Sequence, residues 1–220
     1  MENHTLKKFD RDLEQIKTEL NELAHIVLTE FEQAIDVFDQ PNTELADNIV
    51  AQDRIANQCL SNIEQHGARV LARQHAVADD LRFILSSMRI APRLERVGDY
   101  AKSMAVKSSQ FKQVIPDELN EIFHQMHLHL VTMLRSVIEA YNTKNATQAN
   151  VVWEGDDTLD AYYRDVYTRL IQGFNQQATS SEQLVELLFI AKGLERAGDH
   201  ISDIATDVQF MVDGAIITEY

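Results

Sequence analysis

The sequence predicts an all-α protein built as two tandem three-helix bundles, with six long antiparallel helices arranged as an internal duplication. Three observations support this prediction. The 220 residues include only seven Gly and three Pro, well below the roughly 12% that these two residues make up in average proteins. Apolar side chains recur every three or four positions over long stretches, which is the spacing of one helix face. A seven-residue motif also occurs twice, 100 residues apart.

The first three expected helices are separated by short polar segments. Residues 4–38 carry one continuous apolar stripe, and Pro41 follows its end. A second stripe covers about residues 44–73, with Asn42 or Thr43 placed to cap its first turn. A third covers about residues 79–111.

The last three expected helices repeat this arrangement. Pro116 precedes a fourth stripe over about residues 117–142, and proline is favoured at a helix start. The fifth helix is expected over about residues 146–176 and the sixth over about residues 181–212. Because the connecting segments are short, sequential helices are expected to lie antiparallel.

The repeated motif divides the chain into two matching halves. LERVGDY, beginning at Leu94, recurs as LERAGDH, beginning at Leu194, and eight of the sixteen surrounding positions are identical. Self-similarity of this kind indicates a duplicated structural unit. We therefore expect the first bundle to cover residues 1–112 and the second to cover residues 113–220.

Charge and cysteine content exclude several classes of protein. Thirty-five Asp and Glu outnumber twenty Lys and Arg, which gives a formal charge of −15. This argues against binding to nucleic acid or to an anionic membrane surface, because both depend on basic side chains. The single cysteine, Cys59, excludes an internal disulfide. With no signal-peptide pattern and no apolar run of about 18 residues, we expect a cytoplasmic protein without membrane insertion.

Oxygen-bearing side chains interrupt the apolar stripes of four expected helices. Each helix has two of them four residues apart, so that the pair shares one helix surface. The eight candidate metal ligands are Asp53, Asn57, Glu95, Asp99, Asp156, Asp160, Glu195 and Asp199. Like charges at this spacing repel one another, and a bound cation relieves the repulsion. Clusters rich in oxygen and free of cysteine suit hard divalent cations or iron.

An alternative interpretation pairs these acids with basic side chains. Arg96 and Arg196 lie inside the motif, and Asp99 is within reach of Arg96 or Lys102 on the same helix. The molecule would then be a salt-bridged scaffold without metal. Gly98 costs a helix about 1 kcal/mol relative to Ala, which indicates close approach by a ligand or by a neighbouring helix.

The paired acids and the two L-E-R-x-G-D segments resemble the PhoU family of phosphate-signalling accessory proteins over essentially the whole chain. The resemblance implies a cytoplasmic negative regulator rather than an enzyme. Its partners would be the ATPase of the phosphate ABC transporter, a phosphate sensor histidine kinase, and a second copy of the chain in a homodimer. It also implies metal ions held by the eight candidate residues, with Mg, Mn, Fe, Zn and Ca as the candidates.

Two features of the first half depart from the family pattern. Asn57 stands where a second acid is expected, which removes one negative charge from the first site. Pro92 lies inside the third helix, three residues before Glu95, and an internal proline usually kinks a helix. We therefore expect tighter metal binding in the second half.

A ferritin-like metal oxidase is the enzymatic alternative, because such bundles use Glu-x-x-His pairs. The chain has Glu22 with His25 and Glu121 with His124, but both pairs lie opposite the apolar stripes and are expected to face away from the core. The third and sixth helices carry a second apolar stripe, which we assign to packing between the bundles. Periodicity leaves open whether the acids lie in the core or in a surface groove.

Overall fold

Helices account for almost all of the residues that the structure describes, which are 2–73, 76–176 and 180–214. The structure is a computed structural model. Its helices are α1 (Glu2–Asp39), α2 (Thr43–Arg73), α3 (Ala78–Ser108), α4 (Asp117–Thr143), α5 (Ala146–Glu154), α6 (Asp156–Gln176) and α7 (Ser181–Asp213). No strand occurs in the described ranges, so the predicted all-α class is confirmed.

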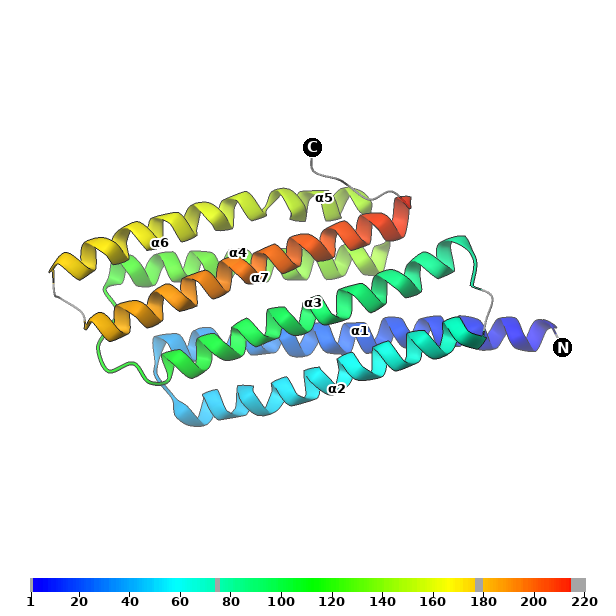
Figure 1. The fold of residues 1–220 in the computed structure, drawn as a ribbon, viewed down its shortest axis with the longest axis horizontal. Coiled ribbons are helices and arrows are strands. Elements are labelled where there is room, and N and C mark those ends of the chain that lie inside the picture. The colour runs from blue at the N-terminus through cyan, green and yellow to red at the C-terminus, as the bar shows by residue number, and fades with distance from the viewer. Residues whose placement is uncertain (1, 74–75, 177–179, 215–220) are drawn as a thin grey trace.

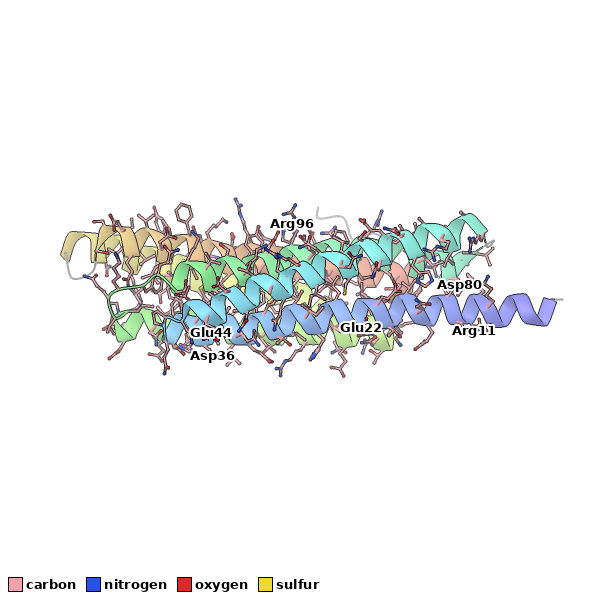
Figure 2. The ribbon with its side chains drawn as sticks, turned by 90° about the horizontal axis from the view of Figure 1, so that it is seen from below. Arg11, Glu22, Asp36, Glu44, Asp80 and Arg96 are labelled. Carbon is pink, nitrogen blue, oxygen red and sulfur yellow. The ribbon has the colours of Figure 1, made fainter. Side chains whose placement is uncertain are left out.

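The helices lie roughly along one long axis, with α3 and α7 side by side in the middle of the molecule (Figure 1). On one side of this central pair lie α1 and α2, and on the other lie α4, α5 and α6. Seen from the side of α1 and α2, the molecule is long and flat, and Arg96 of α3 lies near the middle of its length (Figure 2). None of the described helices has the length and apolar character needed to cross a bilayer.

The duplicated motif meets itself where α3 and α7 pack together. Tyr100 and His200 occupy the same position in the two copies, and their rings stack with centroids 6.0 Å apart. Ion pairs extend this contact along the two helices, since Arg93 pairs with Asp203 and Lys107 Nζ lies 2.6 Å from Glu186 Oε2. Equivalent positions of the two halves therefore meet at Tyr100 and His200.

Aromatic side chains also join the halves through the core. Phe38 of α1 packs on Phe123 of α4 with ring centroids 4.9 Å apart, and Phe83 of α3 stacks on Tyr141 of α4. The Tyr141 hydroxyl shares a 2.8 Å hydrogen bond with Ser87 Oγ. Burial of one such side chain contributes about 1.5–3 kcal/mol. Phe83 belongs to the second apolar stripe of the third predicted helix. Its predicted packing against the other half is thus confirmed.

Gly155 interrupts the fifth predicted helix and separates α5 from α6. Its N–H donates to the carbonyls of Val151 and Val152, and its own carbonyl accepts a 2.8 Å hydrogen bond from His129 Nε2. A Cβ at this position would lie 3.1 Å from the Val152 carbonyl oxygen, so glycine fits this tight turn. The interruption places Asp156 at the first residue of α6.

Helix α3 continues through Pro92 without a break. Proline removes one helix hydrogen bond, and its ring crowds the carbonyl of the residue four positions earlier. The helix therefore accommodates Pro92, and the effect expected of this residue on the first site stays a prediction.

Candidate metal centres

The first acidic cluster lies between α2 and α3. It contains the predicted residues Asp53, Asn57, Glu95 and Asp99. Lys102, one turn after Asp99 on α3, joins the two helices: its Nζ donates to Asp53 Oδ2 at 2.8 Å and to Asp99 Oδ1 at 2.6 Å. Arg96 Nη1 donates to the other oxygen of Asp99 at 3.1 Å. The structure thus brings Asp53 and Asp99 together around an ammonium group.

Asn57 and Glu95 are the other two predicted ligands in this cluster. Asn57 is exposed, and its amide donates to the Asp53 carbonyl at 2.9 Å and more weakly to Asp53 Oδ2 at 3.4 Å. Burial raises the pKa of Glu95, and the neighbouring charge of Asp99 raises it further. The nearest ion-pair nitrogen to Glu95 is Arg96 Nε at 3.9 Å, on an exposed side chain.

Glu30 of α1 is a further acid of the first cluster that sequence analysis missed. Its side chain is fully buried, and neither carboxyl oxygen has a hydrogen-bond partner among the described residues. Burial raises the pKa of Glu30 to about 8, with a further contribution from Asp53 and an opposing one from Lys102. A Cβ at Gly98 would lie 2.7 Å from Glu30 Oε2, so the motif glycine leaves room for this carboxyl. The available signal was an acid three residues after Val27, inside the apolar stripe.

The second acidic cluster lies between α6 and α7. Its members are Asp156, Asp160, Glu195 and Asp199. The pKa of Asp156 is raised to about 6, first by burial and then by the charges of Asp199, Asp160 and Glu195. The pKa of Asp199 is also raised, first by burial and then by Glu195. The structure therefore brings all four carboxyl groups close enough to repel one another.

In the part of the chain that the structure describes, the four acids of the second cluster have only two basic partners, Lys192 and Arg164. Lys192 forms a short ion pair with Glu195 Oε1, while Glu195 Oε2 is buried and has no partner in the described part of the chain. Arg164 reaches Asp160 only at 3.9 Å, between two exposed side chains. Ser202 stands at the position that corresponds to Lys102, so no lysine joins α6 to α7 from that position.

The two clusters fit a metal ion unequally. Within the described ranges, no three His, Cys, Asp or Glu side chains converge closely enough to hold one ion. The second cluster nevertheless has the donor set of a hard-cation site, four carboxylates with one buried oxygen unused. In the first cluster Lys102 already neutralises Asp53 and Asp99. In this conformation the first cluster matches the salt-bridged interpretation, and the second matches it only at Glu195 and Asp160.

The Glu-x-x-His pairs do not form an internal metal site. Glu22, His25 and Glu121 are exposed, and His124 Nε2 lies 2.8 Å from Asp39 Oδ1 at the surface, as predicted from the apolar stripes. The other histidines of α4 bond to the backbone. His127 Nε2 lies 2.9 Å from the Phe31 carbonyl oxygen.

Comparison with known proteins shows the family. The PhoU domain model matches residues 20–107 and again residues 123–208. The chain belongs to the PhoU family. A relative from Xylella fastidiosa, named as a phosphate-specific transport system accessory protein PhoU homolog, is 31% identical over 96% of this chain and 89% of its own length. A relative of the same name from Streptococcus pneumoniae is also 31% identical, over 96% of this chain and 97% of its own.

Solved PhoU structures share the fold over nearly the whole chain. The phosphate transport system regulatory protein PhoU from Streptococcus pneumoniae superposes with a TM-score of 0.87 at 28% identity, covering 96% of this chain and all of that one. PhoU from Pseudomonas aeruginosa gives a TM-score of 0.89 at 25% identity, covering 94% and 100%. The resemblance stated from the L-E-R-x-G-D motifs is confirmed.

Proposed function

We propose that this PhoU-family protein is a cytoplasmic negative regulator of phosphate uptake and of phosphate-responsive signalling. One observation carries the proposal: both halves match the family, and relatives named as accessory proteins of phosphate-specific transport align with 96% of the chain. The partners we propose are the ATPase of the phosphate ABC transporter and a phosphate sensor histidine kinase. The protein would act on them by contact, as a homodimer, with no chemical step of its own.

We further propose that the second acidic cluster binds a hard cation, with Mg²⁺, Mn²⁺, Fe²⁺, Zn²⁺ and Ca²⁺ as candidates. Asp156 and Asp160 would hold it from α6, and Glu195 and Asp199 from α7. The raised pKa of Asp156, caused first by burial and then by the neighbouring carboxylates, supports this assignment, because a bound cation would favour the charged form. The buried Glu195 Oε2 supports it as well, because it has no hydrogen-bond partner among the described residues. These side chains would have to rotate to come together on one ion, because as placed no three of them can hold it. When bound, the cation would neutralise the cluster and present positive charge to a phosphate anion.

Gene deletion and complementation test the regulatory proposal. Deleting the gene in its own organism is expected to leave phosphate-starvation genes switched on in phosphate-rich medium, and the wild-type gene is expected to restore repression. Transcript levels of those genes and the rate of phosphate uptake are the measurements. Normal repression in the deletion strain would contradict the regulatory role.

A paired complementation tests whether the metal site matters for regulation. The variant Glu195→Gln with Asp199→Asn removes two charges from the second cluster and is expected to restore repression poorly. The matched control is Glu182→Gln with Asp213→Asn, which removes two exposed charges from the ends of the same helix. The control is expected to behave as wild type. Equal repression by the two variants would mean that the cluster is not needed for regulation.

A further inference from the structure

We propose that Lys102 is a tethered cation that fills the first acidic cluster, so that a divalent ion enters this half only when the lysine side chain withdraws. The first half would then be a site at which an internal ammonium and an external metal compete. The inference deepens the proposed metal binding and rests on it for the kind of competing ion. Its evidence comes from the first cluster alone.

The ammonium group of Lys102 is shared by two carboxylates from different helices. Its Nζ lies 2.8 Å from Asp53 Oδ2 on α2 and 2.6 Å from Asp99 Oδ1 on its own helix. Burial lowers the pKa of Lys102, but its hydrogen bonds to Asp53 and Asp99 more than offset this, and the net pKa is raised. The side chain therefore stays charged between the two carboxylates. A metal ion bridging α2 and α3 would need the same oxygens.

Glu30 shows that one ammonium does not satisfy the whole cluster. Both of its carboxyl oxygens and Asp53 Oδ1 are buried without a hydrogen-bond partner in the described ranges. Unpartnered buried oxygens are rare in folded proteins, because each loses its hydrogen bonds to water without replacement. An ammonium has three donors, and Lys102 uses two of them on Asp53 and Asp99. Mg²⁺, Ca²⁺ and Mn²⁺ take six or more oxygen ligands, so such an ion could use donors of the cluster that the lysine leaves unused.

The second half supplies an internal comparison. Ser202 replaces Lys102 at the corresponding position, and Lys192 lies on the other side of the motif, where it contacts Glu195. Lys192 also lies over the Tyr163 ring of α6, but among the described residues no lysine forms ion pairs with carboxylates of both helices in the second cluster. The two copies of one motif thus differ in whether a side chain supplies the shared cation.

Binding of Mn²⁺ to the full chain tests the proposal. Calorimetric titration is expected to show one more Mn²⁺ site in Lys102→Met than in wild type. The affinity of the first cluster for Mn²⁺ is expected to be higher in this variant than in wild type by about tenfold or more, because a competing positive charge is gone. The control is Lys107→Met, which removes the same charge from the same helix but faces Glu186 on α7. Adding Glu95→Gln and Asp99→Asn to Lys102→Met should abolish the gained site, and adding Glu30→Gln should weaken it.

The outcomes separate this inference from the proposed metal site of the second half. If Lys102→Met binds no more Mn²⁺ than wild type, while Glu195→Gln with Asp199→Asn loses a site, the inference is wrong and the second site stands. If Lys102→Met gains a site and the second cluster binds nothing, the inference stands and the second site is wrong. Binding at neither cluster refutes both. Lys102→Gln keeps a polar group for the carboxylates and replaces the Met variant if circular dichroism shows that the latter is unfolded.

Discussion

The first and second acidic clusters carry the same motif in different surroundings. In the first, Lys102 and Arg96 hold Asp99, and a buried Glu30 lies behind the cluster. In the second, Glu195 is the one carboxylate with which Lys192 forms a described ion pair, and its ammonium also lies over the Tyr163 ring of α6. The motif therefore specifies where the acids lie, and residues outside it decide how much of their charge is neutralised.

The motif glycines show the same divergence. A Cβ at Gly98 would approach Glu30 and Val27 of α1, whereas one at Gly198 would collide with Leu159 of α6. Each glycine allows close packing, but the approaching helix is different in the two halves. A shared sequence position therefore does not imply a shared neighbour, and the variants below use this difference.

The largest expected effect is stabilisation by metal. Saturating Mn²⁺ at about one hundred times its Kd should stabilise the protein by about 2.7 kcal/mol, which is about 5–10 °C in melting temperature for a chain of this size. Glu195→Gln with Asp199→Asn should remove most of this increase, because the second cluster lacks a bridging lysine. Glu95→Gln with Asp99→Asn should remove little. Thermal unfolding with and without Mn²⁺ measures both.

Two results would break that comparison. An equal loss from both double variants would contradict the difference between the clusters. A melting temperature unchanged by Mg²⁺, Mn²⁺, Ca²⁺, Zn²⁺ and Fe²⁺ would leave the salt-bridged interpretation for both halves.

The next largest effect is a pH dependence centred on Glu30. Its pKa is raised from 4.5 to about 8 on folding, so the unfolded chain loses this proton first as pH rises. Wild-type stability should therefore fall between about pH 4.5 and pH 8 and level off above that. Glu30→Gln removes this dependence and should be more stable than wild type at pH 8. Urea unfolding over a pH series measures the difference.

Asp156 provides the matched pH measurement in the second half. Its pKa rises from 3.8 to about 6, so the advantage of Asp156→Asn should develop between about pH 4 and pH 6 and then stay constant. The two windows end about two pH units apart. A Glu30→Gln advantage that does not change between pH 6 and pH 8 would show that Glu30 is not held protonated.

Alanine at the motif glycines should have a smaller effect. Gly198→Ala should destabilise by about 1–2 kcal/mol, because overpacking against buried Leu159 outweighs the gain in helix propensity. Gly98→Ala should also destabilise, since its Cβ would lie 2.7 Å from Glu30 Oε2. The control is Gly193→Ala on α7, whose Cβ would make an ordinary 3.4 Å contact with Tyr100 and should stabilise by up to about 1 kcal/mol. Stabilisation by all three substitutions would refute the close approach at the motif.

The smallest expected effect tests the contact between the halves. Tyr141→Phe removes the hydroxyl that shares a 2.8 Å hydrogen bond with Ser87 Oγ. Ser87 keeps its bond to the Phe83 carbonyl, so the cost should be about 1 kcal/mol. Denaturant unfolding measures it, with Ser87→Ala as the partner variant. A double variant whose loss equals the sum of the two single losses would show that the two hydroxyls are not coupled.

Much of the fold and part of the site were predictable from local pattern. The three-to-four residue spacing located the helices, and the repeated L-E-R-x-G-D segment indicated the duplication. The break at Gly155 was not predicted, because the apolar stripe continues across it and the turn depends on the contact with His129 of α4. Glu30 was missed because a single acid inside one apolar stripe has no repeat to mark it.

The sequence by itself determined the all-α duplicated architecture and the helix surfaces that carry the paired acids, because both follow from spacing within single helices. The tertiary structure alone decided that Lys102 bridges to Asp53, 49 residues away in the chain, and that Glu30 is buried against Gly98. These facts depend on how closely helices from distant parts of the chain approach one another. Charge compensation acts over a few ångströms in space, and periodicity along one helix does not report the distance to the next.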